Sequence, residues 1–252
     1  MLPGTIQVIP IHGMAEIQPG DSIVAAVLGA AQAAQLAICS GDVLVLKHKI
    51  IAKSEGRIVR LAEIRPSARA RSWAARWKRD ARLIELALQN AGRVVRMSKG
   101  VLITQTPHGF VCANSGIDVS NVDGGTSAVL LPVDADASAR RIMAGLRRKL
   151  KLHIPVIIAD SFGRPWREGL VEAAIGVAGL KPLRDLRGRR DQHGYTLHAT
   201  AEAVADELAS LAGLACGKFE RVPACIVRGF CYQPGRGSVS QLLRPPERDL
   251  FR

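Results

Sequence analysis

Aromatic residues are scarce in this sequence, at 4% of its 252 residues. Proteins that bind single-stranded nucleic acid usually present an array of aromatic rings on which the bases stack. The scarcity therefore argues against that class of protein. The formal net charge of +13 still indicates anionic partners, whether phosphates, carboxylates or nucleic acid.

Paired cysteines are also missing. The chain has five cysteines, an odd number, and no two of them form a C-x-x-C motif. This pattern argues against a disulfide framework and against a structural zinc site. No basic segment precedes an apolar stretch near the start, so the sequence shows no secretory signal. We therefore expect a cytoplasmic protein with reduced thiols.

The common nucleotide and hydrolase motifs are absent. The sequence has neither a G-x-x-x-x-G-K-[ST] phosphate loop nor a G-x-G-x-x-G motif behind a strand. It also lacks a G-x-S-x-G nucleophile elbow and an H-E-x-x-H helix. A nucleotide would therefore be held by a less common arrangement, and no catalytic residue is assigned.

Long hydrophobic runs are absent as well. The longest uncharged stretch, between Asp21 and Asp42, is built largely from alanine with few large aliphatic residues. Asp21 and Ser22 resemble a helix N-cap, and Gly41 resembles a helix stop. We expect a buried packing helix here and no membrane partner.

The sequence does contain runs of β-branched residues. These runs alternate with segments whose apolar residues recur at helical spacing. The runs, each bounded by Gly, Pro or Asp, predict strands at 43–46, 101–104, 110–113, 155–159 and 224–227. Apolar residues at helical spacing predict helices at 73–88, 139–150 and 204–215. The mixture predicts an α/β fold, of the α+β kind with mixed sheets. No linker divides residues 1–252, so we expect one unit, with two intimately packed subdomains as the alternative.

A cluster of positive charge lies on the expected helix within 138–151. The simplest interpretation is a solvated face, and a role in binding a partner is the alternative. The cluster consists of Arg140, Arg141, Arg147, Arg148, Lys149 and Lys151.

Two polar segments each place an aspartate next to an apolar run. Asp118 lies in the segment 114–121, and Asp160 opens the segment 160–167. Two converging carboxylates would form a hard oxygen site for Mg²⁺ or Mn²⁺. The alternative is that both are ordinary turn or cap residues. Lys53, just past a strand, either neutralises a phosphate or is an exposed loop lysine.

At these residues the sequence resembles the coenzyme F420-0:γ-glutamyl ligase family. The resemblance runs through nearly the whole chain, in motifs that keep their order and compatible separations. They are PIHG (10–13), GDVLV (41–45), KSEGR (53–57), NSGIDVSNV (114–122), DSFGRPWR (160–167), AIGVAGL (174–180), RRDQHG (189–194), ADELA (205–209) and PACIVRG (223–229).

The resemblance implies an acid–amino-acid ligase that is GTP-dependent and GDP-forming. It would add L-glutamate to coenzyme F420-0 through a γ-linked amide, by way of an acyl phosphate, with Mg²⁺ or Mn²⁺ and with potassium. It also implies the family's own α/β fold and an intertwined homodimer. Some bacterial relatives carry a further nitroreductase-like domain, whereas this chain stops at Arg252. We therefore expect the stand-alone ligase.

The resemblance also assigns roles to individual residues. Asp118 and Asp160 would be metal ligands, with Ser161 at a metal-contacting hydroxyl position. His48 stands where many relatives have a small hydroxyl residue beside the nucleotide. The remaining nucleotide-binding residues would be Gly13, Met14, Ala15, Glu16, Ile17, Lys53 and Asn121.

The sequence departs from the family at Lys218, where many archaeal members have an acidic or amide residue that can serve a second metal. A protonated lysine cannot ligate a metal, so either the segment 216–220 swings away or Lys218 supplies part of that metal's positive charge and contacts a phosphate itself. We expect the second. Two rival functions remain open: a metal-dependent GTP phosphohydrolase, and a basic nucleic-acid-binding protein with salt-dependent affinity.

Overall fold

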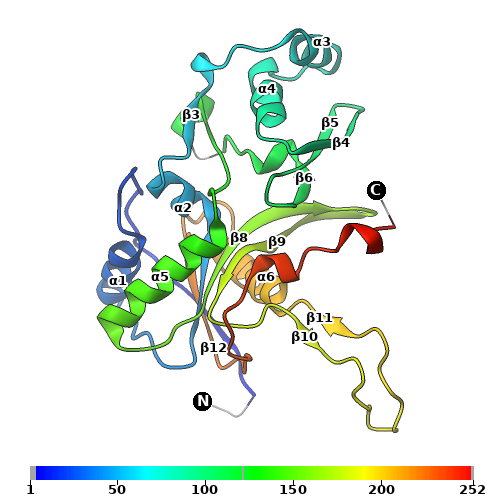
Figure 1. The fold of residues 1–252 in the computed structure, drawn as a ribbon. Coiled ribbons are helices and arrows are strands. Elements are labelled where there is room, and N and C mark those ends of the chain that lie inside the picture. Colours follow the sequence, from blue (N-terminus) through cyan, green and yellow to red (C-terminus); the bar gives the residue numbers. More distant parts are fainter. Residues whose placement is uncertain (1–3, 121, 251–252) are drawn as a thin grey trace.

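A five-stranded mixed sheet lies at the centre of the computed structural model, which describes residues 4–120 and 122–250. Strands β2 (Val43–Lys47) and β8 (Val156–Arg164) are parallel, and the other neighbouring pairs are antiparallel (Figure 1). The mixed α/β class is thereby confirmed. In spatial order the strands are β1 (Gln7–Pro10), β12 (Ala224–Arg228), β2 (Val43–Lys47), β8 (Val156–Arg164) and β9 (Arg167–Ala178).

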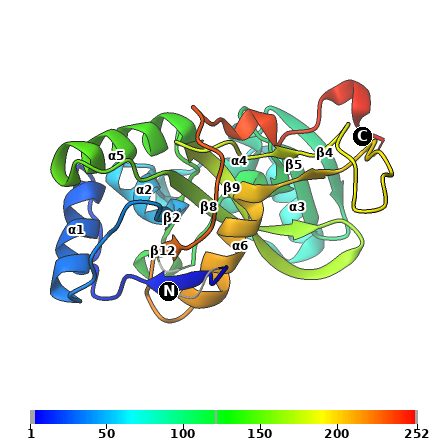
Figure 2. The same ribbon diagram turned by 90° about the horizontal axis from the view of Figure 1, so that it is seen from below.

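Helices cover both faces of this sheet (Figure 2). On one face, α1 (Ile23–Ala33), α2 (His48–Ser54) and α5 (Ala135–Leu150) pack against alternate strand residues such as Leu44. On the other face, α6 (Val204–Cys216) packs against the intervening residues, such as Val43. Burial on both faces explains why 43–46 is continuously apolar rather than alternating.

A smaller region follows α2 and lies beyond one end of the central sheet in Figure 1. Its strands form an antiparallel three-stranded sheet and a separate antiparallel pair. Ala70, Ala74, Ile84 and Leu102 form part of its core. The elements are β3 (Ile58–Arg60), α3 (Ala68–Trp77), α4 (Ala81–Gln89), β4 (Arg93–Ser98), β5 (Val101–Gln105), β6 (Val111–Ala113) and β7 (Ser127–Val129).

Two hairpins extend from the central sheet. The distal half of the β8–β9 hairpin is exposed and carries Trp166 and Leu170 at its surface. The second projection contains β10 (Arg184–Asp185) and β11 (Ala201–Glu202), which form a short pair at its base (Figure 1). Exposed apolar side chains on such projections favour contact with another surface.

Most of the strands and helices expected from the sequence are confirmed. The strands at 43–46 and 224–227, the 101–113 hairpin, and the helices at 139–150 and 204–215 all form. The helix after Ser22 also forms, with Ser22 as its N-cap, but it ends at Ala33 rather than near Gly41. Gln35 adopts a positive φ, and the amide of Leu36 bonds back to Ala31, which terminates the helix.

Two expectations about element boundaries are wrong. The single helix predicted across 73–88 is two helices, because Lys78 adopts a left-handed conformation and Asp80 caps the next helix. The strand expected to stop at Asp160 continues to Arg164, since β8 pairs with β9 along its whole length. Asp160 therefore lies within a strand and not in a loop. Within 4–120 and 122–250, no helix is long and apolar enough to cross a membrane.

Candidate functional site

The register of the central sheet brings His48 next to Asp160. Lys47 ends β2 opposite Ala159 of the parallel strand β8, so the next residue on each chain also lies alongside. His48 Nδ1 lies 3.1 Å from Asp160 Oδ1, and the two side chains are only 3% and 12% exposed. The contact places a ring nitrogen directly against a carboxylate oxygen in a nearly water-free environment.

The other nitrogen of His48 has no hydrogen-bond partner among the described residues. Nε2 is buried and makes no hydrogen bond to any described residue. Buried polar atoms are almost always hydrogen-bonded, so an orphaned nitrogen calls for an explanation such as a missing ligand. The sequence predicted that His48 contacts a nucleotide, and this orphaned atom is available for such a contact.

Lys49, the next residue of α2, contacts Asp118, the second carboxylate predicted to bind metal. Lys49 Nζ lies 2.8 Å from Asp118 Oδ2, and it also donates to the backbone carbonyl and the hydroxyl of Ser120. Asp118 Oδ1 accepts a bond from the Ser120 amide at 2.6 Å. Burial acts to raise the pKa of Asp118, but the hydrogen bonds from Lys49 and Ser120 outweigh it and leave the pKa below its usual value. Asp118 is therefore a carboxylate at neutral pH.

Consecutive residues of α2 thus contact both aspartates that the sequence predicted as metal ligands. Their oxygens are hard donors of the kind that Mg²⁺ and Mn²⁺ prefer. Among the described side chains, no three His, Cys, Asp or Glu residues are grouped closely enough to hold a metal ion alone. Mg²⁺ usually needs only one or two carboxylates, because waters and substrate phosphates complete its coordination. The donor set fits that arrangement.

The predicted nucleotide-binding residues Lys53 and Glu16 also meet. The Lys53 ammonium forms an ion pair with the Glu16 carboxylate, which joins the 13–17 loop to α2. In that loop Ile17 is buried and Met14 packs against the core, whereas Ala15 and Glu16 are exposed. Gly13 has a φ of +77°, a backbone conformation that L side chains rarely adopt. The loop is therefore anchored at several points, and Asn121 lies outside the described residues.

Sequence reasoning missed Glu172, which contacts the predicted metal-contacting hydroxyl. Ser161 and Glu172 face each other across the β8–β9 pair, and Ser161 Oγ donates to Glu172 Oε1 at 2.7 Å. The Lys218 ammonium hydrogen-bonds Ser161 Oγ and lies 3.5 Å from Glu172 Oε1. A sequence prediction that extended β8 beyond Asp160, and that paired it with β9, would have placed Ser161 opposite Glu172.

Lysine 47 fixes the turn that carries Lys218. The Lys47 ammonium donates to the backbone carbonyl of Gly217, directly after α6. Gly217 has a positive φ of 57° at this helix end. Lys218 therefore places positive charge beside Ser161 and Glu172. That this charge replaces part of a second metal's charge stays a prediction.

The negative charge of Asp160 affects the pKa of the Cys112 thiol. Burial, reinforced by the Asp160 carboxylate, raises the pKa of Cys112 to about 12. Cys112 is therefore a neutral, unreactive thiol at physiological pH, and it serves as a packing residue next to the site.

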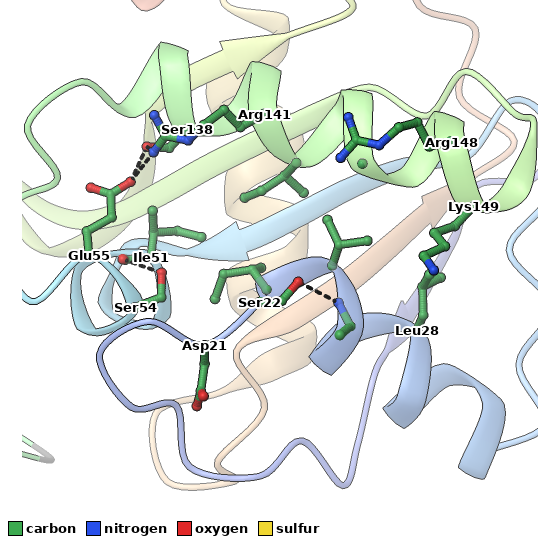
Figure 3. Close-up of a pocket in the computed structure, with 15 residues that line it drawn as sticks. Asp21, Ser22, Leu28, Ile51, Ser54, Glu55, Ser138, Arg141, Arg148 and Lys149 are labelled. Carbon is green, nitrogen blue, oxygen red and sulfur yellow. Dashed lines mark hydrogen bonds and ion pairs between the residues drawn. The ribbon is translucent and has the colours of Figure 1, made fainter.

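A separate cavity of about 420 Å³ lies under α5 (Figure 3). At one end Arg141 Nη2 bonds Glu55 Oε1 at 2.6 Å and Ser138 Oγ at 2.9 Å. Arg148 and Lys149 lie toward the other end of the cavity, farther along α5. None of the residues expected to bind nucleotide or metal lines this cavity.

Comparison with known proteins shows the family. The family model described as F420-0:Gamma-glutamyl ligase matches residues 13–229. The match covers most of the chain, so the chain belongs to the F420-0:γ-glutamyl ligase family. The expected resemblance is confirmed.

Three archaeal relatives cover most of the chain, and each is a coenzyme F420:L-glutamate ligase. The protein of Methanothermobacter thermautotrophicus is 43% identical, over 98% of this chain and 99% of its own. That of Methanopyrus kandleri is 38% identical, over 98% of each chain. That of Methanocaldococcus jannaschii is 40% identical, over 87% of this chain and 88% of its own.

Proposed function

We propose that this chain is a GTP-dependent ligase that adds L-glutamate to coenzyme F420-0 through a γ-linked amide. The observation that carries the proposal is the pairing of Asp160 with His48 and of Asp118 with Lys49 on one turn of α2. It occurs in a chain that is 43% identical over nearly its full length to a coenzyme F420:L-glutamate ligase.

The nucleotide would bind where α2 meets the 13–17 loop. Lys53 and Glu16 lie together there, and a lysine suits a phosphate as a charge-assisted hydrogen-bond donor. The orphaned Nε2 of His48 supplies a further buried contact at the start of the same helix. The proposed contact between Asn121 and the nucleotide is based on the sequence motif alone.

A divalent cation, Mg²⁺ or Mn²⁺, would be held by Asp118, Asp160 and Ser161. When bound, it would neutralise phosphate charge and polarise phosphoryl oxygens. Among the residues with described placement, Asp160 Oδ2 has no hydrogen-bond partner, so one oxygen is already available. Potassium is proposed as a second cofactor from the family resemblance alone.

The reaction requires activation of a carboxylate. The carboxylate of F420-0 would attack the γ-phosphorus of GTP, forming an acyl phosphate and releasing GDP. The amine of glutamate would then displace phosphate and lose a proton to form the amide. Such steps depend mainly on positioning and charge neutralisation. The positive charges of Lys47 and Lys218 support this chemistry without a protein nucleophile.

We also propose that two copies assemble as a homodimer. Trp166 and Leu170, at the end of the β8–β9 hairpin, are 78% and 63% exposed, and Phe219 after α6 is 94% exposed. Large exposed apolar side chains on projecting segments favour an interface. Sedimentation analysis of the wild type and of Trp166→Ser would test this assembly.

Mass spectrometry tests the proposed activity directly. The protein is incubated with F420-0, L-glutamate, Mg²⁺ and either GTP or ATP, and the masses of the deazaflavin products are recorded. We expect a product one glutamyl residue heavier, with release of GDP, only in the GTP sample. Release of GDP without a heavier product would identify a phosphohydrolase and contradict the proposal.

A further inference from the structure

A second cavity, of about 300 Å³, lies where the smaller region meets the end of α2. Its polar lining includes Arg57, Asn90, Thr106 and His108, and its apolar lining includes Leu130 and Leu131. No acidic residue of the described chain lines it. Its volume is at the lower end of the range of about 300–1,000 Å³ found for small-molecule pockets.

Arg57 brings an uncompensated positive charge to this cavity. Its Nε donates to the carbonyl of Leu131 at 3.1 Å, and its own carbonyl accepts the amide of Leu130, so the residue is fixed on both sides. Within 4–120 and 122–250, no carboxylate pairs with its guanidinium. By contrast, Arg60 pairs with Glu63 and Arg141 pairs with Glu55. A half-buried, oriented guanidinium of this kind is suited to bind a carboxylate with two hydrogen bonds.

His108 brings an unused acceptor. Its Nε2 lies 2.9 Å from the carbonyl oxygen of Val133, and a carbonyl only accepts, so Nε2 carries the proton. In the neutral ring Nδ1 is then an acceptor, and it is buried with no hydrogen-bond partner in the described part of the chain. Burying an unsatisfied polar atom costs free energy, so Nδ1 calls for a ligand that donates a hydrogen bond.

The Arg57 guanidinium and the Nδ1 atom of His108 are together complementary to an amino acid. A carboxylate satisfies the guanidinium of Arg57, and an ammonium satisfies Nδ1 of His108. We propose that this cavity binds the L-glutamate substrate by its carboxylate and its α-ammonium group. The inference rests on the proposed ligase function and assigns the amino-acid site within it.

The location of the cavity agrees with this assignment. Ile117, which lines it, directly precedes Asp118. Rings also connect the cavity to β8: His108 stacks on Phe110 with centroids 5.9 Å apart, and Phe110 lies 6.0 Å from Phe162. Phe162 is two residues after Asp160, so ring contacts and the segment 117–118 link the cavity to the proposed nucleotide and metal site.

The test compares Arg57→Gln with two matched variants that remove the same charge elsewhere. Arg60→Gln changes an arginine three residues away that is already paired with Glu63. Arg148→Gln changes the cavity under α5 (Figure 3). Losing a charge-assisted hydrogen bond should raise the KM for glutamate about 10- to 100-fold in Arg57→Gln. The KM for GTP should stay within about twofold in all three variants, since none removes a proposed nucleotide contact.

A second variant keeps the test decisive if Arg57→Gln does not fold. His108→Phe preserves a ring against Phe110 and removes the Nδ1 acceptor. Calorimetric titration with L-glutamate and with glutarate, which lacks the ammonium, measures the preference of each protein. We expect the wild type to prefer glutamate, and we expect His108→Phe to lose most of that preference.

Three results would overturn the inference. They are an unchanged KM for glutamate in Arg57→Gln, an equal preference for glutamate in His108→Phe and the wild type, and a rise in the KM for F420-0 alone. The last would assign the cavity to the carboxylate of F420-0. Failure of the ligase proposal is distinguishable, because the wild type would then form no heavier product while calorimetry still reports amino-acid binding.

Discussion

Asp160 and Asp118 are contacted by consecutive residues of α2, yet their surroundings differ. Asp160 is 12% exposed, and its Oδ1 lies 3.1 Å from His48 Nδ1 and accepts a hydrogen bond from the Ser161 amide. Its Oδ2 has no partner among the described residues. Asp118 is 36% exposed, and both of its oxygens are engaged, Oδ1 by Ser120 and Oδ2 by the Lys49 ammonium.

The difference indicates two ways of preparing a carboxylate for a cation. Asp160 is oriented by hydrogen bonds that leave one oxygen available, so it can bind a cation without rearrangement. Asp118 is neutralised by Lys49, so a cation that binds there must first displace an ammonium. We therefore expect Asp160 to contribute more to the binding of metal and nucleotide than Asp118.

Asp160→Asn should lower turnover more than any other substitution. A loss no larger than that of Asp118→Asn would contradict the difference between the two aspartates. The amide keeps the shape and can still accept from His48, but it removes the charge. We expect turnover to fall about 10²- to 10³-fold, the range found when one preorganised electrostatic group is removed. Thermal unfolding followed by circular dichroism should show a melting temperature within about 4 °C of wild type, because about 1 kcal/mol corresponds to 2–4 °C at this size.

Glu63→Gln is the matched control, since it removes a carboxylate that pairs only with exposed Arg60 among the described residues. It should leave turnover unchanged. Wild-type turnover of Asp160→Asn at limiting Mg²⁺ would show that Asp160 is a packing residue.

Lys218→Gln should give an intermediate effect. The Lys218 ammonium bonds the hydroxyl of Ser161, next to Asp160, and we expect it to carry part of the charge of a second cation. Its replacement should lower activity at low Mn²⁺ and raise the half-saturating Mn²⁺ concentration several-fold, as measured by ligation rates over a Mn²⁺ series. Equal rates at every Mn²⁺ concentration would identify Lys218 as an ordinary surface lysine.

The smallest effect concerns acid stability. The folded-state pKa of Asp118 is lowered by Lys49 and Ser120 against the effect of burial, so its charge stabilises the fold above the unfolded-state pKa. That contribution is lost as the pH falls through the lowered pKa. The melting temperature of wild type should therefore exceed that of Asp118→Asn near neutral pH, and the difference should shrink below about pH 4. A difference that grows on acidification would reverse the sign of the assigned pKa shift.

The sequence predicted local structure well where a single segment determines it. The β-branched run of β2, the turn between β5 and β6, and the apolar period of α5 are local patterns, and all three elements form. The break at Lys78 was missed because the apolar stripe continues in phase from α3 into α4. The extension of β8 was missed because its pairing with β9 sets its end.

The candidate site was predicted as a set of residues but not as an arrangement. The motifs identified Asp118, Asp160 and Ser161, whereas the partners of Asp160 and Ser161 follow from the register of distant strands. The parallel β2–β8 register places His48 beside Asp160, and the β8–β9 register places Glu172 beside Ser161. The cavity at Arg57 and His108 depends on packing between separate regions, which local sequence patterns do not specify.

Manganese binding in the presence of GTP tests the central claim most directly. Electron paramagnetic resonance of Mn²⁺ titrated into the wild type, Asp160→Asn and Asp118→Asn reports the bound fraction without requiring turnover. We predict tight Mn²⁺ binding by wild type with GTP, near-complete loss in Asp160→Asn and a smaller loss in Asp118→Asn. Wild-type binding by both variants would contradict the account, because neither carboxylate would then take part in the nucleotide and metal site.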